Sequence, residues 1–383
     1  MFNFKKFSPL LLGLSLVVIS CDKEEIIDAE VLVPAEEIIV PVDFRYLTLN
    51  SAGHITGGKP SISYIHQDGT FNLNHFSKVN GVDMQSDSRN ACQIGDKLFL
   101  LQKDRDIYEM NPNTFKLTRT IKNEVEFSPY EMVNLGGDSA LVVGATSKWP
   151  SIPTVVVGDL KGNSFIKRSF NTDFTVHKAV RVGSKIFMAG GRTQFNLEWT
   201  YSKLAVMDIN NISKDSIRTI VDKVDLSSSN SNLCVDKNNN LWFINEENYA
   251  LKLYGVDTEN EKVLYTIDLP NTASTYNETA YTINIKNNEI YIRNHKAFYV
   301  ISLDNPTAPD EPNYQYRGQV GTLNDLKLTK EGNLLVINEV GGSNKPSKVI
   351  ELTPSKESDW SIVSENDIDP NANSIYLSKY ETK

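Results

Sequence analysis

The sequence predicts an all-β fold: a single β-propeller with seven four-stranded blades. From Phe44 onward, short apolar strands alternate with turns rich in Gly, Asn or Asp, and no segment has a convincing helical period. One unit recurs six times, and it consists of a turn, an apolar strand, a second turn and a further strand ending near Asp or Asn. Successive copies lie about 42 to 55 residues apart, which is close to the period of a four-stranded propeller blade.

The six clear copies begin with the same turn-plus-strand pattern. The first apolar residues of their strands are Leu98, Ala140, Ile186, Leu241, Ile290 and Leu334. A degenerate seventh copy, PSISYIHQDGTFNLNHF from Pro60, precedes them. Strands such as LFLL and LLVI are apolar on both faces, as expected when antiparallel sheets stacked around a ring cover one another. Seven copies therefore predict seven blades.

Closing a ring usually requires the first and last strands to share a blade. FRYLTLN (residues 44–50) and NSIYLSKY (residues 373–380) both alternate apolar and polar residues, and we expect one of them to complete the blade containing the final repeat. Two separate β-domains are the alternative, but no linker-like segment interrupts residues 44–380.

DKNNN at Asp236 also fits the start of a calcium loop. Because Leu241 stands where such a loop needs Gly, we predict a blade hairpin there.

The N-terminus predicts export. Lys5 and Lys6 precede an apolar run over residues 10–19, which is too short for a membrane span of about 20 residues, so residues 1–20 are predicted to be a signal peptide. Val18 and Ser20 before Cys21 resemble the lipobox of bacterial lipoproteins, in which the cysteine is lipidated and becomes the new N-terminus. The acidic residues 22–25 resemble a surface-export tag of Bacteroidetes-type Gram-negative bacteria.

These resemblances imply a lipoprotein anchored in the outer membrane through Cys21 and exposed at the cell surface. Residues 21–43 carry many acids and two prolines, which predicts an extended tether, although their apolar pairs could instead dock on the fold. Residues 44–383 are predicted to form the propeller.

The net charge of −9 argues against a nucleic-acid partner. Cys92 and Cys234 occupy equivalent places in distant repeats, so we expect buried free thiols rather than a disulfide.

A family resemblance comes from the repeats. Residues 95–121 resemble a blade of the YVTN-type propellers, and residues 180–190 and 234–245 resemble the middle of other blades. The matching positions in the first of these segments are Ile107, Asn111, Thr114, Phe115, Thr120 and Ile121. With the lipobox and acidic tag, the chain is similar to surface lipoproteins that include cobalamin-capturing proteins. That resemblance implies capture of a small nutrient or cofactor, such as a corrinoid, and docking on an outer-membrane transporter.

Function in a propeller usually belongs to loops at one end of the ring, which in this chain are the segments just before each innermost strand. These segments combine aromatic, amide and charged side chains, which suits a hydrogen-bonding pocket for a polar ligand. The predicted ligand-binding residues are Arg89, Tyr130, Glu131, His177, Lys178, Asn230, Tyr276, Asn277, Glu278, Asn324 and Asp325. Sugar binding and docking of a protein partner are further binding roles for the same surface.

The alternative is a lactonase-, lyase- or quinoprotein-like enzyme. His177 with Glu131 and Glu278 could perform acid–base chemistry or hold a metal. The five histidines, however, show no HxH or HxxxH spacing, and the sequence has no G-x-S-x-G elbow, no C-x-x-C-H haem motif and no phosphate-binding glycine loop. We therefore predict no catalytic residue, metal or cofactor, and we favour a binding function.

Overall fold

The computed structural model describes most of the chain after residue 43. The described residues are 44–50, 59–103, 106–122, 127–147, 151–162, 165–191, 193–195, 198–200, 202–226, 232–247, 250–270, 279–318, 322–339, 346–355, 360–368 and 372–377. The chain divides into two compact units, Met1–Pro41 and Val42–Lys383, and every described residue belongs to the second. The predicted signal peptide, the lipidation site Cys21 and the tether lie outside the described residues. Within the described ranges, no helix has the length and apolar character that a bilayer crossing requires.

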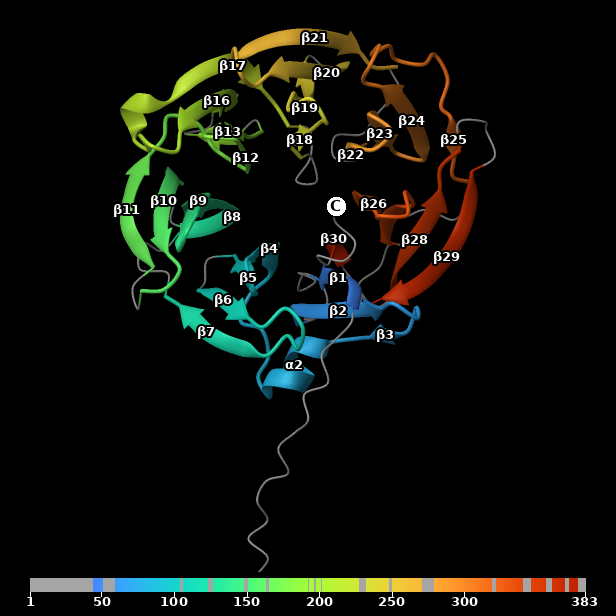
Figure 1. Ribbon diagram of the computed structural model, residues 1–383. Helices are drawn as coiled ribbons and strands as arrows, with labels where there is room; N and C mark the ends of the chain where they lie inside the picture. The colour runs from blue at the N-terminus through green and yellow to red at the C-terminus, as the bar shows by residue number, and fades with distance from the viewer. Residues whose placement is uncertain are drawn as a thin grey trace, which may run out of the picture. The chain divides into compact units, whose positions relative to one another are not determined.

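Seven four-stranded antiparallel sheets stand in a ring, which confirms the predicted seven-bladed β-propeller (Figure 1). In each blade the four strands follow one another from the ring axis outward. Blade 1 contains β30 (Ala372–Leu377), β1 (Phe44–Asn50), β2 (Ser61–His66) and β3 (Phe71–Asn72). Blade 2 contains β4 (Ser88–Ile94), β5 (Lys97–Gln102), β6 (Ile107–Met110) and β7 (Leu117–Ile121). Blade 3 contains β8 (Phe127–Gly136), β9 (Ser139–Thr146), β10 (Pro153–Asp159) and β11 (Ile166–Asn171).

The other four blades repeat this arrangement. Blade 4 contains β12 (Lys178–Val182), β13 (Lys185–Ala189), β16 (Ser202–Asp208) and β17 (Arg218–Val224). Blade 5 contains β18 (Cys234–Val235), β19 (Leu241–Glu247), β20 (Ala250–Asp257) and β21 (Lys262–Asp268). Blade 6 contains β22 (Thr279–Asn284), β23 (Glu289–Asn294), β24 (Ala297–Ser302) and β25 (Tyr314–Gln315). Blade 7 contains β26 (Thr322–Leu328), β27 (Leu334–Glu339), β28 (Ser347–Thr353) and β29 (Ser361–Ile368).

Three small elements decorate the ring. A two-stranded hairpin of β14 (Thr193–Phe195) and β15 (Glu198–Thr200) is inserted in blade 4 between β13 and β16. Helix α2 (His75–Asn80) connects blades 1 and 2, and a 3₁₀ turn, η2 (Lys214–Ser216), precedes β17. Helix α2 has a single turn and a half, which is too short to produce a helical period in the sequence.

The six predicted turn-plus-strand units are the hairpins between the first and second strands of blades 2 to 7. Each hairpin turn contains a Gly or Asn with positive φ, the conformation that tight hairpin turns require. These residues are Gly95, Gly137, Gly183, Asn239, Asn288 and Gly332. In blade 5, the Asp236 carboxylate accepts hydrogen bonds from the backbone N–H groups of Asn238 and Asn240 and from Trp242 Nε1. The predicted blade hairpin at Asp236 is therefore confirmed.

The prediction about ring closure was wrong. The strands at both ends of the propeller, β1 and β30, pair with each other, and β1 also pairs with β2. They complete blade 1, whereas blade 7 already has the four strands β26 to β29 of its own. The repeat copy from Pro60 supplies only the two outer strands β2 and β3, so its blade needs both terminal strands as its inner half.

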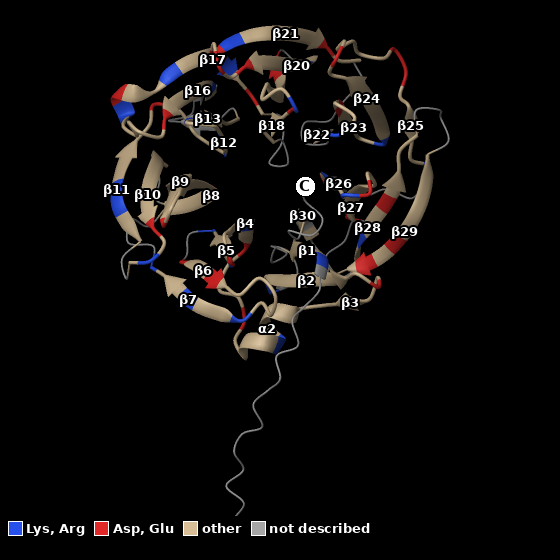
Figure 2. Ribbon diagram, viewed as in Figure 1, with Lys and Arg blue, Asp and Glu red and all other residues tan. Residues whose placement is uncertain are grey.

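The core lies between neighbouring blades rather than within one sheet. One cluster of buried side chains joins Phe187 of blade 4, Trp242 of blade 5 and Ile292 of blade 6. Strand β9 is buried along six successive residues, because neighbouring blades cover both faces of its sheet. The outer strands β11, β17, β21 and β29 carry bands of charged residues, as Figure 2 shows. This packing holds the innermost strands in fixed positions around the ring axis.

Candidate functional site

The predicted site residues of blades 2, 3 and 4 come together at the end of the ring where the innermost strands begin. We name this region the axial rim. It is formed by Arg89, Asn90, Tyr130, Glu131, His177 and Lys178. Each blade contributes two successive residues, from the first half of β4, from the first half of β8, and from the start of β12 with the residue before it.

One side of the axial rim is a row of three groups in contact. The guanidinium carbon of Arg89 lies 5.5 Å from the centre of the Tyr130 ring, within cation–π range. The Tyr130 and His177 rings meet edge to face, with 4.9 Å between centroids and 86° between planes. Blades 2, 3 and 4 are therefore linked through side chains that remain at least partly exposed.

The other side of the axial rim is centred on the Glu131 carboxylate. Asn90 Nδ2 donates to Glu131 Oε1 at 2.8 Å, and Lys178 Nζ lies 3.5 Å from Oε2. Burial raises the pKa of Glu131 above its ordinary value, and the cations Lys178 and Lys327 only partly oppose that shift. Sequence reasoning did not identify Asn90, although it lies directly beside Arg89 in the same predicted segment.

His177 is held as a neutral ring. The backbone N–H of Gly191 donates to His177 Nδ1 at 3.3 Å, so Nδ1 acts as the acceptor and the proton of the neutral ring resides on Nε2. Burial, followed by the nearby charges of Lys178 and Arg89, lowers the pKa of His177 to about 4. At neutral pH this imidazole is a hydrogen-bond donor through Nε2 and a weak base.

Two glycines fix the backbone that holds His177. A Cβ added at Gly190 would lie 2.1 Å from the Thr175 carbonyl oxygen, and one at Gly191 would lie 3.1 Å from the Leu226 carbonyl oxygen. The backbone therefore passes too close to its neighbours to carry a side chain at Gly190. These glycines follow β13, and Gly191, which contacts His177, lies two residues before the start of the inserted hairpin β14–β15.

Asp325, a further predicted ligand-binding residue, is only 2% exposed and its carboxylate is used within the fold. Oδ1 accepts from the Leu326 N–H and Oδ2 from the Ile375 N–H, both at 2.8 Å. Lys327 Nζ lies 3.3 Å from Oδ1. Sequence reasoning did not identify Lys327, which follows the predicted segment on β26 and acts electrostatically on Glu131.

Several predicted residues cannot be placed in this geometry. Asn230, Tyr276, Asn277 and Glu278 lie outside the described residues. Asn324 belongs to β26, where the structure describes its backbone pairing with Ile337. The predicted partnership of His177 with Glu278 therefore stays a prediction.

The described residues contain no group of three or more His, Cys, Asp or Glu that could hold a metal ion. Cys92 on β4 and Cys234 on β18 are both free thiols. Burial raises the pKa of each thiol to about 12, which makes them poor nucleophiles at neutral pH.

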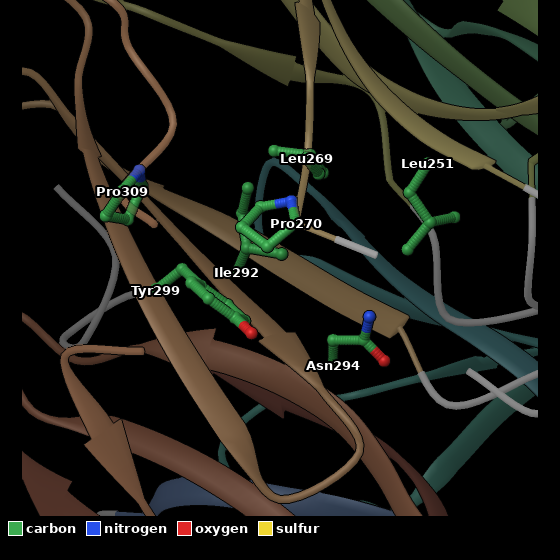
Figure 3. A pocket seen from close by; sticks show the side chains of 7 residues that line it. All are labelled: Leu251, Leu269, Pro270, Ile292, Asn294, Tyr299 and Pro309. Atoms are coloured by element: carbon green, nitrogen blue, oxygen red, sulfur yellow. The ribbon is translucent and has the colours of Figure 1, made fainter. Parts of the chain in front are cut away.

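A small pocket lies between blades 5 and 6, away from the innermost strands (Figure 3). Its lining is mostly apolar, with the side chains of Asn294 and Tyr299 as its polar members. The lining residues are Leu251, Leu269, Pro270, Ile292, Asn294, Tyr299 and Pro309. Because none of these side chains is charged, the pocket differs in character from the axial rim.

Comparison with known proteins identifies the fold class. No protein-family model and no curated protein sequence matches the chain. Among solved structures, a quinoprotein alcohol dehydrogenase-like protein from Bacteroides thetaiotaomicron matches with a TM-score of 0.66 and 14% identity, over 88% of this chain and 79% of that one. A 6-phosphogluconolactonase-like protein from Bacteroides uniformis matches with a TM-score of 0.58 and 13% identity, over 88% of this chain and 100% of that one.

Hydrazine synthase from Kuenenia stuttgartiensis matches with a TM-score of 0.52 and 13% identity, over 78% of this chain and 95% of that one. At these identities the likenesses establish the architecture alone. The protein is a seven-bladed β-propeller, and two of these structural neighbours are propellers from Bacteroides species.

Proposed function

We propose that the chain is a ligand-binding propeller whose axial rim holds a small polar nutrient or cofactor. The observation that carries this proposal is the meeting of three adjacent pairs from three blades: Arg89 with Asn90, Tyr130 with Glu131, and His177 with Lys178. They place an aromatic face, a neutral imidazole and several hydrogen-bonding groups within one small, partly exposed region. Such convergent polar groups beside an aromatic surface are typical of ligand sites.

The state of His177 supports binding over catalysis. A general base works best when its pKa lies near the operating pH, whereas the pKa of His177 is lowered to about 4. Glu131 is tied to Asn90 and Lys178, so it acts as a counter-ion within the fold. Rigid positions and neutral donors favour recognition of a ligand.

The cellular setting belongs to the same proposal. The lipobox that ends at Cys21 and the acidic residues 22–25 support a lipoprotein held at the outer membrane and exposed at the cell surface. In that setting, the propeller captures a nutrient, with a corrinoid as the specific case implied by the family resemblance, and passes it to an outer-membrane transporter. The sequence features support this address, and the propeller supplies a scaffold for capture.

A thermal-shift titration of purified protein with cobalamin, other corrinoids, sugars and divalent metals tests the proposal. A ligand that binds only the folded state raises the melting temperature as its concentration increases. We expect a shift that the Tyr130→Ala variant loses and that the control Lys262→Ala, on the outer strand β21, retains. No shift with any compound would contradict capture of a small ligand. Turnover of an added lactone or alcohol, lost in a His177→Gln variant, would instead support the enzyme alternative.

A further inference from the structure

We infer that the axial rim and the adjacent ring interior bind a small organic anion, most simply a carboxylate, through the ammonium groups of Lys178 and Lys327. This inference rests on the proposed function and names the chemical class of its ligand. Lys178 begins β12 in blade 4, and Lys327 lies on β26 in blade 7. Both belong to innermost strands, although the chain separates them by about 150 residues.

The two lysines act on the same groups near the ring axis. Lys178 Nζ is 3.5 Å from the Glu131 carboxylate, and Lys327 Nζ is 3.3 Å from the Asp325 carboxylate. The charges of both lysines also reach Glu131 on β8 and Cys234 on β18. Both lysines lie on innermost strands and act electrostatically on the same two groups, so both ammonium groups lie within electrostatic reach of the ring interior. A carboxylate bound between the two lysines would contact both of them.

The two described carboxylates of this region already have hydrogen-bond donors. The Asp325 carboxylate accepts two backbone hydrogen bonds, and the Glu131 carboxylate accepts one from Asn90. Each ammonium group has three donors, and the described carboxylate contact of each lysine commits one of them. Among the described side chains of this region, the ammonium donors thus outnumber the carboxylate contacts, and the matching ligand is rich in acceptors. A carboxylate has two acceptor oxygens and no donor.

Exposure and charge favour the same ligand. The side chains of Lys178 and Lys327 are 18% and 26% exposed, so a ligand can reach them while the surrounding protein weakens solvent screening. Arg89 adds a third cation, and neutral His177 adds an Nε2–H donor. Among the described residues, the three cations Arg89, Lys178 and Lys327 face the two carboxylates Glu131 and Asp325. This leaves an excess of positive charge here in a chain whose net charge is −9.

Calorimetric titration of the full chain in detergent, with succinate and citrate as probes, tests the inference. Neutral succinamide and cationic 1,4-diaminobutane serve as matched compounds of similar size. We expect the carboxylates to bind, and we expect Lys178→Met and Lys327→Met each to lose about 10- to 100-fold in affinity, as for a hydrogen bond to a charged group. Lys178→Arg keeps the charge and is expected to retain most of the affinity. Lys167→Met, on the outer strand β11, is the control and should bind normally.

Two outcomes would overturn the inference, and they are distinguishable from failure of the proposed function. If the carboxylates do not bind, or bind equally to the folded Lys178→Met and Lys327→Met variants, the anion site is wrong. If succinamide, the diamine or cobalamin then binds in a Tyr130-dependent manner, the proposed function survives with a different ligand. If no compound of any charge binds, both are wrong. Melting temperatures of the variants establish that each is folded.

Discussion

The Oδ2 atom of Asp325 accepts a hydrogen bond from the backbone N–H of Ile375 at 2.8 Å, joining blade 7 to the strand that closes the ring. The two residues are 50 positions apart, on the innermost strands β26 and β30. Asp325 adopts a positive φ of 43°, which Asp tolerates better than most residues, at an irregularity in the pairing of β26 with β27. The carboxylate therefore links blade 7 to blade 1, and we call this junction between the two blades the seam.

Replacing Asp325 with Ala should strongly destabilise the propeller. The change leaves two buried N–H groups, those of Leu326 and Ile375, without their acceptor, and it places Ala at a positive φ. We expect a loss of about 2–5 kcal/mol in the free energy of unfolding, measured by urea denaturation. Asp325→Asn, which keeps one acceptor and tolerates this φ, should lose less. Equal stabilities of the Ala variant and the wild type would show that the seam does not depend on this carboxylate.

A second contact across the same seam should depend on pH. Arg45 on β1 binds Glu351 on β28 through two hydrogen bonds of 2.7 Å, and Asn333 Nδ2 donates to the same carboxylate. Burial alone would raise the pKa of Glu351, but the hydrogen bonds from Arg45 and Asn333 outweigh it and hold the pKa below 4.5. Its contribution to stability is therefore complete above about pH 4.5 and decreases as the pH falls through the lowered pKa.

Glu351→Gln should thus lower the free energy of unfolding by about 2–4 kcal/mol at pH 7, with a smaller difference in acid. Urea denaturation at several pH values from 7 down to 3 measures both effects. The control is Glu259→Gln, because the side chain of Glu259 is exposed. A difference between Glu351→Gln and wild type that stayed constant across this range would contradict the linkage.

Two partly buried histidines should make the protein less stable in mild acid. Burial, followed by nearby cations, lowers the pKa of His75 and of His177 from 6.5 to about 4. The unfolded chain therefore binds protons first, and stability falls as the pH decreases from about 6.5 to about 4. Each histidine contributes at most about 3 kcal/mol over this window.

The His177→Asn variant should show a shallower loss of stability between pH 6.5 and 4 than the wild type. Chemical denaturation at closely spaced pH values measures the slope. His295→Asn is the matched control, because His295 is exposed in a turn at φ 52°, where Asn is well tolerated. Identical slopes for His177→Asn and wild type would mean that His177 titrates alike in the folded and unfolded states.

The two propeller thiols should react slowly in the folded protein. Burial raises the pKa of Cys92 and Cys234 to about 12, so very little thiolate exists at pH 8. In a Cys21→Ser variant, a disulfide reagent should modify both thiols rapidly in denaturant and much more slowly in native buffer. Rapid modification of two equivalents without denaturant would contradict the burial of these residues.

The sequence predicted the blades well because their signals are local. Each inner hairpin needs a residue with positive φ, and Gly or Asn occupies that position in all six predicted turns. The partner of a strand is not a local property. The alternation of FRYLTLN identifies β1 as a strand. It does not reveal that Arg45 of this strand binds Glu351, which lies 306 positions further along the chain. For this reason the terminal strands β1 and β30 were expected to complete the blade of the final repeat, whereas they complete blade 1.

Which candidate site residues lie together could be predicted only in part, for a related reason. The structure brings Arg89, Tyr130 and His177 of blades 2 to 4 together, but Arg89 and Tyr130 lie within β4 and β8 and only His177 precedes its strand. Ligand binding by these residues stays a prediction. Strand position alone does not reveal which of two successive side chains finds a partner in the next blade. Asn90 was missed because its role depends on Glu131 of the neighbouring blade. The carboxylate of Asp325 faces the seam because β26 is irregular there, which its sequence does not reveal.

The pairing of β1 with β30 also sets the order in which this protein can mature. Blade 1 lacks its innermost strand until residues 372–377 have been synthesised and have paired with β1. By then the chain for every other blade is already present. Until then, β1 keeps an unpaired backbone edge of the kind that invites association with other chains. Because this last step joins sequence-distant strands, it should be slow compared with hairpin formation. A nascent chain stalled before residue 372 would therefore be an open arc, prone to chaperone capture or aggregation.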